Sequence, residues 1–272
     1  MVDGTAVNGG EQDRPTLDTG VPQTARIWNY LLGGKDNFAA DREVGDQIIA
    51  NLPQLAQNAR LSRAYLARAV RHLAGTAGVR QFLDVGTGLP TADNTHEVAQ
   101  SVVPDARIVY VDNDPLVLAH ARALLVGTPE GATDYVDADL RDPDRILRAA
   151  SRTLDLDQPV AVMLMGILGH VESDEEAKSI IDGLVGRLPS GSYLAMYDGS
   201  DTSEAVTEAV RIWNLSANPR YHLRSPERIA GLFEGLELVE PGVVSVTRWR
   251  PDGDPAELPE EIDQYCAVGR KP

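Results

Sequence analysis

The sequence predicts an α/β fold in which helices cover both faces of a mostly parallel β-sheet. From residue 79 onward, short and continuously apolar segments alternate with helical ones. Such segments are typical of parallel strands that are buried on both faces. The last two expected strands have no helix between them, so we expect them to pair antiparallel at one edge. The prediction is therefore a seven-stranded sheet whose last strand is antiparallel.

A separate helical region precedes the first strand. Residues 1–20 are polar, lack apolar periodicity and are expected to form a disordered tail. A helix begins at Thr24 and stops at Gly33-Gly34, since glycine commonly ends helices. Further helices are expected at 41–51 and 61–73, the latter with arginines on its outer face. Residues 21–78 are thus predicted to be an N-terminal helical cap.

Residues 79–272 are expected to form the main domain. Its strands are predicted at 81–85, 107–111, 133–137, 160–165, 193–197, 236–246 and 264–268. The helices between them are predicted at 91–102, 115–125, 143–150, 175–187, 203–216 and 225–231.

Composition restricts the class of protein and of partner. The chain has 272 residues, of which 43% are hydrophobic, and this is enough for a sizeable core. With 25 basic against 41 acidic residues the net charge is −16, which disfavours nucleic-acid partners and favours small molecules or proteins. We see no bilayer-spanning stretch and no secretory signal, and a single cysteine, Cys266, excludes an internal disulfide. A cytoplasmic protein without membrane partners is expected; the sequence does not indicate the oligomeric state.

The most informative segment is Asp84-Val-Gly-Thr-Gly88, where the first strand runs into a glycine-rich turn. Gly86 and Gly88, with Thr87 between them, let the backbone approach a nucleotide-like ligand. A dinucleotide-binding turn needs a third glycine, and Thr91 occupies that position. Asp84 would repel a pyrophosphate, but it suits a cationic ligand.

Acidic residues also follow the next two strands. Asp112 comes at the end of the second strand, where a carboxylate can accept hydrogen bonds from both ribose hydroxyls, and Asn113 follows it. After the third strand, Asp139 is placed to accept from an adenine amino group, and Leu140 to pack on the ring.

These three sites together resemble the class I S-adenosylmethionine-dependent methyltransferases. The resemblance implies a Rossmann-like methyltransferase fold of seven strands, with the last strand antiparallel. It implies S-adenosylmethionine as the cofactor, with Gly86 and Gly88 near its methionine part, Asp112 on the ribose and Asp139 near the adenine. Methyl transfer needs positioning and desolvation more than a catalytic side chain.

A second resemblance covers nearly the whole chain after the tail. The string from Ala25 to Arg42, together with Gly88-Leu-Pro-Thr91 and the six residues 94–99, is similar to an actinobacterial family of S-adenosyl methyltransferases of unassigned substrate. The paired glycines at 33 and 34 suggest a lid in which Tyr30, Lys35 or Asn37 touches cofactor or substrate. A plain helix end with solvated polar residues is the alternative.

His170 follows the fourth strand, at the expected mouth of the substrate pocket, and is a candidate general base. A structural or merely exposed histidine is the alternative. No histidine has metal-ligand partners at suitable spacing, so no metal site is expected.

The sequence therefore predicts a methyltransferase acting on an oxygen or nitrogen of a small-molecule acceptor. Two alternatives remain: a non-catalytic S-adenosylmethionine-binding or regulatory protein, and an NAD-dependent oxidoreductase.

Overall fold

A single twisted sheet forms the centre of the computed structural model, which describes residues 18–124, 127–254 and 257–272. Within these residues the sheet has eight strands in the order β3-β2-β1-β4-β5-β8-β6, and β7 also pairs with β8. The strands are β1 (Gln81–Val85), β2 (Arg107–Asp112), β3 (Ala132–Asp137), β4 (Ala161–Met165), β5 (Tyr193–Gly199), β6 (Glu237–Leu238), β7 (Val244–Ser245) and β8 (Gln264–Arg270).

The first five strands are parallel, and β8 runs antiparallel between β5 and β6. The predicted fold class is thus confirmed, including the antiparallel last strand. The expected sixth strand, 236–246, is divided into β6 and β7, because the turn at Val239–Gly242 separates them. Both short strands still pair antiparallel with β8, as the missing helix between the last two strands predicted.

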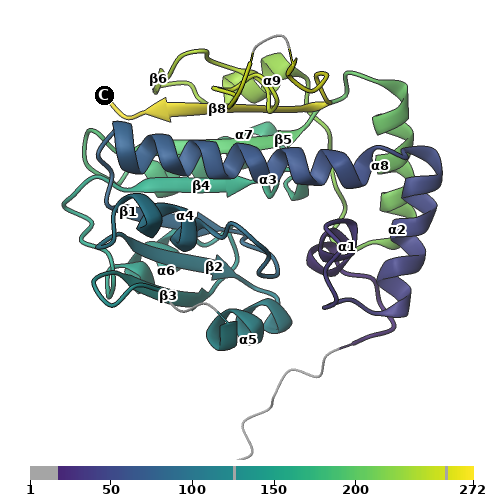
Figure 1. Cartoon of the computed structure of the whole chain (residues 1–272), viewed down its shortest axis with the longest axis horizontal. Coiled ribbons are helices and arrows are strands. Elements are labelled where there is room, and N and C mark those ends of the chain that lie inside the picture. The colour runs from purple at the N-terminus through teal and green to yellow at the C-terminus, as the bar shows by residue number, and fades with distance from the viewer. Residues whose placement is uncertain (1–17, 125–126, 255–256) are drawn as a thin grey trace, which may run out of the picture.

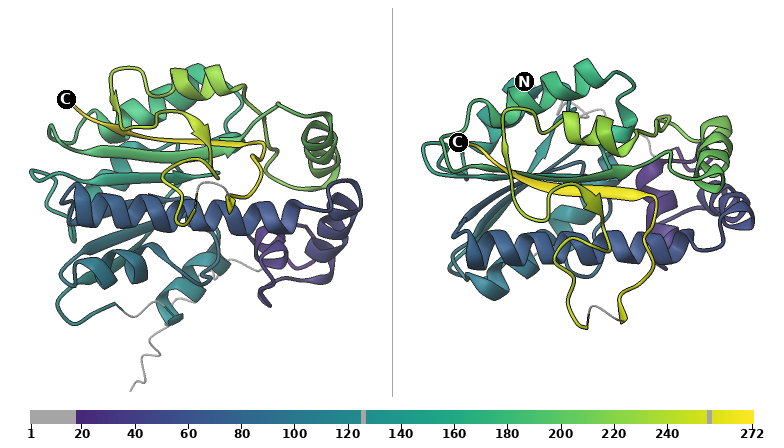
Figure 2. Two further views of the ribbon diagram at one scale, coloured as in Figure 1. Left: turned by 45° about the horizontal axis from the view of Figure 1, so that its top comes forward. Right: turned by 90° about the horizontal axis from the view of Figure 1, so that it is seen from above.

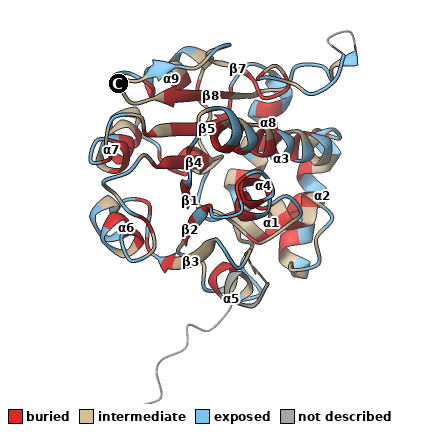
Figure 3. Cartoon of the chain, turned by 60° about the vertical axis from the view of Figure 1, so that its left-hand side comes forward, coloured by how far each residue is buried: buried red, intermediate tan, exposed pale blue. Residues whose placement is uncertain are grey.

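Helices cover both faces of the sheet (Figure 2). On one face, side chains of Leu83 and Val109 pack against α6 (Pro143–Ala150), α7 (Asp174–Val185) and α9 (Pro226–Gly231). On the other face, the alternate residues Phe82 and Ile108 pack against α3 (Leu55–Arg71) and α4 (Thr95–Val102). Figure 3 shows the resulting burial, with the inner faces of the helices buried and their outer faces exposed.

A third hydrophobic cluster lies beyond the carboxyl ends of the parallel strands (Figure 1). It joins α1 (Thr24–Leu31) and α2 (Ala39–Asn51) to α8 (Glu204–Ser216), together with two residues from α3 and the segment before it. We call this the outer helical cluster; its buried members are Ile27, Leu31, Val44, Ile48, Leu52, Ala59, Val206, Ala209, Trp213 and Ala217.

The N-terminal helices differ from the prediction in two respects. The third helix begins at Leu55 rather than 61 and continues through Arg71 into a π-helical turn at His72–Thr76. It packs along the sheet, whereas α8, predicted as part of the main domain, packs with α1 and α2. Most of the predicted tail, residues 1–17, lies outside the described residues, so the division at 20 and 78 stays a prediction.

The helix after the glycine turn begins at Thr95, four residues later than expected. Asn94 and Glu97 form a reciprocal cap there, because the Glu97 carboxylate accepts from the Asn94 backbone N–H at 2.8 Å. Residues 91–94 therefore remain in the loop that borders the turn. The next helix, α5 (Pro115–Leu124), begins where predicted, and its expected last residue, Leu125, lies outside the described residues.

In the part of the chain that the structure describes, no helix is both long enough and apolar enough to cross a bilayer.

Candidate active site

The turn after β1 lies at the carboxyl end of the sheet. The N–H groups of Gly86 and Thr87 donate to the Val111 carbonyl oxygen at 2.8 and 3.4 Å, which fixes the turn against β2. Gly86 and Gly88 have φ angles of +74° and +64°, a region that L-residues with side chains rarely adopt. A Cβ on Gly86 would lie 2.4 Å from the Ile167 side chain, whereas a Cβ on Gly88 would meet open space. Gly88 is therefore the glycine that keeps the backbone accessible to a ligand.

Two carboxylates flank this turn. Asp84 is 4% exposed and accepts from the Thr95 hydroxyl at 2.6 Å. Burial raises the pKa of Asp84 to about 6, although this hydrogen bond and the charge of Arg63 oppose the shift. Asp112 accepts from the backbone N–H groups of Gly88 at 3.0 Å and Asp114 at 2.9 Å, and burial raises its pKa too. The turn thus lies between acidic groups, as a cationic ligand requires.

Arg63 is a site residue that the sequence analysis missed. Its Nη2 donates to the carbonyl oxygens of Ala92 and Asp93, at 3.1 Å each, so the guanidinium lies over the loop that follows the glycine turn. Its Nε is buried and has no hydrogen-bond partner among the described residues. Sequence periodicity predicts that the arginines of this helix face outward, and for Arg63 this prediction is wrong. The packing of α3 across the sheet, which sequence periodicity does not define, places this one at the site.

His170 lies in a short 3₁₀ turn, Leu168–His170, that follows β4. Its Nδ1 is 2.7 Å from the Arg220 carbonyl oxygen, which can only accept, so Nδ1 carries the proton and Nε2 has the free lone pair. Burial lowers the pKa of His170, and nearby His222 and Arg141 lower it further. The imidazole is therefore neutral at physiological pH and can accept a proton.

A buried ionic network fixes the loop that carries His170. Asp198, at the end of β5, accepts from the Gly169 N–H at 3.0 Å and from the Tyr221 hydroxyl at 2.9 Å. Arg224 lies 3.6 Å from the same carboxyl group and donates to the Leu168 carbonyl oxygen at 2.8 Å. The ring of Tyr221 packs edge-to-face on His170 with centroids 5.1 Å apart. These contacts fix the imidazole beside the strand ends.

The glycine turn, the two carboxylates beside it, Arg63, His170 and Tyr221 border one cavity of about 250 Å³ between the strand ends and the outer helical cluster. Seven of the sequence-predicted residues line it: Asp84, Gly86, Thr87, Gly88, Asp112, Asn113 and His170. Five others are not among its lining residues: Tyr30, Lys35, Asn37, Asp139 and Leu140.

Neither of the two residues predicted to contact adenine lines the cavity. Asp139 is exposed, and its carboxylate accepts from the Asn113 side-chain amide at 3.3 Å. Leu140 is 9% exposed and packs in the core beneath the sheet. Asn113 therefore connects Asp139 to the cavity.

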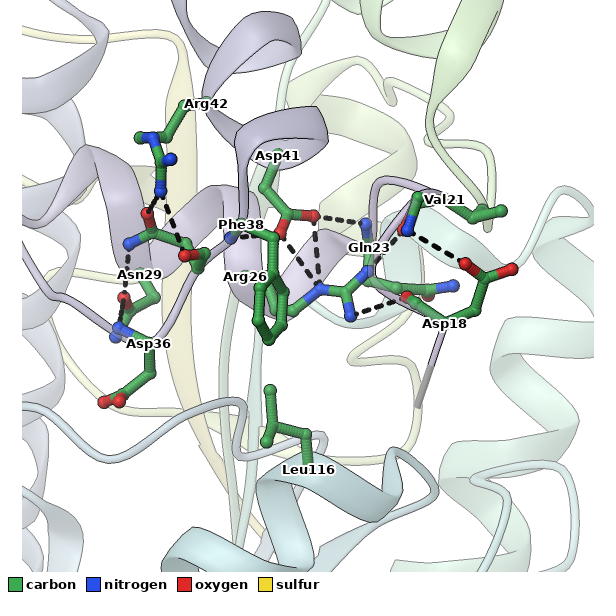
Figure 4. A network of polar contacts seen from close by, with 12 residues as sticks. Asp18, Val21, Gln23, Arg26, Asn29, Asp36, Phe38, Asp41, Arg42 and Leu116 are labelled. Atoms are coloured by element: carbon green, nitrogen blue, oxygen red, sulfur yellow. Dashed lines mark hydrogen bonds and ion pairs between the residues drawn. The ribbon is translucent and has the colours of Figure 1, made fainter. Parts of the chain in front are cut away.

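The residues between α1 and α2 form a polar network around Asn29, which does line the cavity (Figure 4). The Asn29 side-chain oxygen accepts from the Asp36 N–H at 3.0 Å and from the Asn37 amide at 2.9 Å. Gly33 has a φ of +81°, and a Cβ on Gly34 would lie 2.3 Å from the Asn29 side chain. Two glycines are therefore needed, one for the helix end and one for contact with Asn29.

Of the remaining predicted cap residues, the Tyr30 hydroxyl donates to Asp46 at 2.6 Å, and Lys35 is exposed. No contact among the described residues brings Tyr30 or Lys35 to the glycine turn.

A buried ion pair fixes α1 against α2 (Figure 4). Arg26 and Asp41 are 1% and 0% exposed, with Nε 3.1 Å from one carboxylate oxygen and 3.2 Å from the other. The same carboxylate accepts from the N–H groups of Gln23 at 2.9 Å and Phe38 at 2.8 Å, and Arg26 also donates to the Asp18 carbonyl at 3.0 Å. Because Gln23 lines the cavity, this pair fixes one side of the cavity wall.

Among the described residues, no group of three or more histidine, cysteine, aspartate or glutamate side chains could hold a metal ion.

Comparison with known proteins identifies the family. A family model described as S-adenosyl methyltransferase matches residues 10–272. The chain belongs to the S-adenosyl methyltransferase family. Its cofactor is accordingly S-adenosylmethionine, which confirms the cofactor prediction and excludes an NAD-dependent oxidoreductase.

Solved structures agree with this assignment. A DUF574 family protein from Streptomyces avermitilis MA-4680 is 46% identical, with a TM-score of 0.89, and the match covers 94% of this chain and 99% of that one. A protein of Thermobifida fusca YX, to which methyltransferase activity is provisionally ascribed, is 44% identical with a TM-score of 0.86; coverage is 96% and 99%.

More distant structures share the fold alone. Magnesium protoporphyrin IX methyltransferase from Synechocystis PCC 6803, solved with bound S-adenosylhomocysteine, is 13% identical with a TM-score of 0.54; the match covers 90% of this chain and 93% of that one. None of the curated protein sequences searched matches the chain.

The residues around the cavity fit the cofactor of this family. S-Adenosylmethionine carries a sulfonium, an ammonium group, a carboxylate and two ribose hydroxyls. The carboxylates of Asp84 and Asp112 would suit the cationic and hydroxyl groups, and Arg63 Nε, which has no partner among the described residues, would suit the carboxylate. Gly88 leaves the space above the turn open.

Proposed function

We propose that this protein transfers the methyl group of S-adenosylmethionine to an oxygen or nitrogen atom of a small molecule. The observation that carries the proposal is the continuity of the cavity. One cavity borders the glycine turn, a neutral histidine and the outer helical cluster. A cofactor at the turn and an acceptor beneath the outer helices would therefore share one enclosed space.

The cofactor would lie along the strand ends. Asp112 accepts hydrogen bonds from the ribose hydroxyls, and Asp84 faces the ammonium group. Arg63 pairs with the cofactor carboxylate, since it is the one permanently cationic side chain among the described lining residues and its charge acts on Asp84. Gly86, Thr87 and Asn113 contribute the surrounding wall, and Asp139, which is bonded to Asn113, would lie at the adenine end.

When bound, the cofactor supplies an electrophilic methyl group on a positively charged sulfur. The chain's own contribution is to position the acceptor, exclude water and accept a proton. Nε2 of His170 has a free lone pair, and its pKa is lowered by burial, so it can remove a proton from an acceptor hydroxyl or amine. Displacing water strengthens the electrostatic interactions inside the cavity.

The proposed lid is the inner face of α1. Trp28, Asn29 and Leu32 line the cavity from this helix, and Asn37 supports Asn29. Calorimetry of S-adenosylhomocysteine binding to Asn29→Ala tests this wall, and Lys35→Ala tests direct contact by the exposed lysine. Direct contact requires that Lys35→Ala also weakens binding.

The central experiment is transfer of tritiated methyl groups from S-adenosylmethionine to the components of a metabolite extract. Wild type should label a small molecule. His170→Asn keeps a donor at the position of the Nδ1–H, in the form of a side-chain amide, but removes the base, so kcat should fall about 10²- to 10⁴-fold with cofactor affinity retained. The pH profile of kcat should also lose its acidic limb. Cofactor binding with no labelled product in any extract would favour a non-catalytic cofactor-binding protein instead.

A further inference from the structure

The outer half of the cavity has a different chemical character from the half at the glycine turn. Its wall comes from α1, α2, α3, α8 and the segment after α8, and Figure 1 shows α1, α2 and α8 grouped beyond the strand ends. Most of its lining side chains are apolar: Ala25, Trp28, Leu32, Ile48, Leu52, Leu55, Leu66, Val206, Ala209, Val210, Trp213, Pro219 and Leu223.

Charge complementarity excludes an anionic occupant. Arg63 is the one permanently cationic side chain among the described residues that line the cavity, and it is held at the loop after the glycine turn. Asp263 lines the cavity on the side of β8, with its carboxylate bonded to the hydroxyls of Thr202 and Ser203. A carboxylate or phosphate in the outer half would thus lose its hydration without gaining a cation, which is costly.

Two buried hydrogen-bond donors in this half lack partners in the part of the chain that the structure describes. Thr24 Oγ1 and Trp213 Nε1 belong to residues that line the cavity, and neither has an acceptor among the described residues. Buried donors are normally satisfied, so an unpaired one indicates that a partner comes from elsewhere. An oxygen or nitrogen on the occupant would supply the acceptor.

Aromatic surface is available on two sides of the same space. Trp28 contributes from α1 and is partly exposed, and Trp213 contributes from α8. Indole rings bind planar apolar groups well, because such groups bury large areas and stack on the ring.

We infer that the outer half of the cavity binds an apolar, non-anionic small molecule with a planar ring and a hydroxyl or amine group, and that this molecule is the methyl acceptor. The identification as methyl acceptor rests on the proposed function. Binding in the outer half rests on the cavity alone.

The test is calorimetric titration of the protein, saturated with S-adenosylhomocysteine, with two probes of matched shape. 2-Naphthol is neutral at pH 7.5, and 2-naphthoate carries a carboxylate on the same ring system. 2-Naphthol should bind, and 2-naphthoate should bind at least tenfold more weakly. Absence of 2-naphthol binding, or equal affinity for both probes, would overturn the inference.

Variants locate the binding. Val210 is half-buried on α8 and lines the cavity, so Val210→Phe should fill the outer half and weaken 2-naphthol binding at least tenfold. Leu215, on the same helix and 70% exposed, does not line the cavity, and Leu215→Phe should bind like wild type. Ala25→Leu provides an independent block from α1. Unchanged S-adenosylhomocysteine binding verifies that each variant is folded; unaltered 2-naphthol binding in both blocked variants would refute the location.

Methyl transfer separates this inference from the proposed function. If 2-naphthol binds in the outer half but no acceptor is ever methylated, the binding site stands and the proposed activity fails. If an anionic acceptor is methylated while 2-naphthol does not bind, the activity stands and the inference about the acceptor fails.

Discussion

Replacement of Asp112 by alanine gives the most direct test of the proposed cofactor orientation. Its carboxylate lies at the end of β2 and already accepts from the Gly88 and Asp114 N–H groups at 3.0 and 2.9 Å. Burial raises the pKa of this group, which shows that solvent stabilises its charge poorly. Ribose hydroxyls that bond to it would therefore gain a strong, charge-assisted interaction.

The expected loss in Asp112→Ala is about 1–3 kcal/mol of binding free energy, the usual cost of removing one hydrogen bond to a charged group. This corresponds to a roughly 5- to 150-fold increase in the dissociation constant. Calorimetry with S-adenosylhomocysteine measures this change without requiring a known acceptor. Because the variant also leaves the Gly88 and Asp114 N–H groups without this acceptor, urea denaturation should accompany the titration.

The neighbouring strand provides the control. Asp137 pairs in register with Asp112 at the end of β3, but it is exposed and does not line the cavity. Asp137→Ala should bind the cofactor like wild type. Should Asp112→Ala bind S-adenosylhomocysteine within twofold of wild type, the ribose assignment must be abandoned.

Three further predictions concern stability and the glycine turn. A pKa of Asp84 raised from 3.8 to about 6 means that the folded state binds a proton more tightly than the unfolded state, so the free energy of unfolding falls as pH rises from about 4 to 6. Asp84→Asn should remove this loss, raising stability at pH 7.5 by up to ~3 kcal/mol while weakening cofactor binding. If the wild-type free energy of unfolding in urea did not change between about pH 4 and 6, Asp84 would not be the source of a pH dependence. Arg224→Met should lower the free energy of unfolding in urea by ~3–5 kcal/mol, because it leaves Asp198 buried without its cation. Arg228 is exposed, so Arg228→Met should lower it by at most ~1 kcal/mol. Equal losses in the two variants would refute this distinction. Gly88→Ala should lose ~1–2 kcal/mol of stability, because alanine is strained at the φ of +64°. It should also place a methyl group in the cavity and weaken cofactor binding. Normal cofactor binding by this variant would show that the ligand does not approach residue 88.

The string 25–42 shows how a sequence signature can have a structural origin. Arg26 and Asp41 form the buried ion pair between α1 and α2, and Gly34 lies against Asn29. Asn37 bonds to Asn29 rather than lining the cavity. The sequence singled out the segment as functional, and the structure shows that its polar residues mainly hold one wall of the cavity in place. Sequence spacing could not distinguish these roles, because both require polar residues at a helix end.

Local patterns were sufficient for the sheet and for the glycine turn. Strands buried on both faces must be continuously apolar, so β1, β2, β4 and β5 were recognisable one by one. The absence of a helix before the last strand also revealed the antiparallel edge. Asp84, Gly88 and Asp112 could be found because parallel strands bring their carboxyl ends to the same edge of the sheet.

Only the tertiary structure shows which helices cover the carboxyl ends of the parallel strands. Sequence periodicity predicts that the arginines of α3 face solvent, but Arg63 lines the cavity. The helix α8, far along the chain, packs with the N-terminal helices. Both placements depend on how helices cross the sheet and one another, which is determined by packing between distant segments. The sequence by itself thus determined the methyltransferase sheet and the acids beside its glycine turn. Only the folded chain established the apolar outer half of the cavity, because its wall joins α1 and α2 to α8, which follows them by more than 150 residues in the sequence.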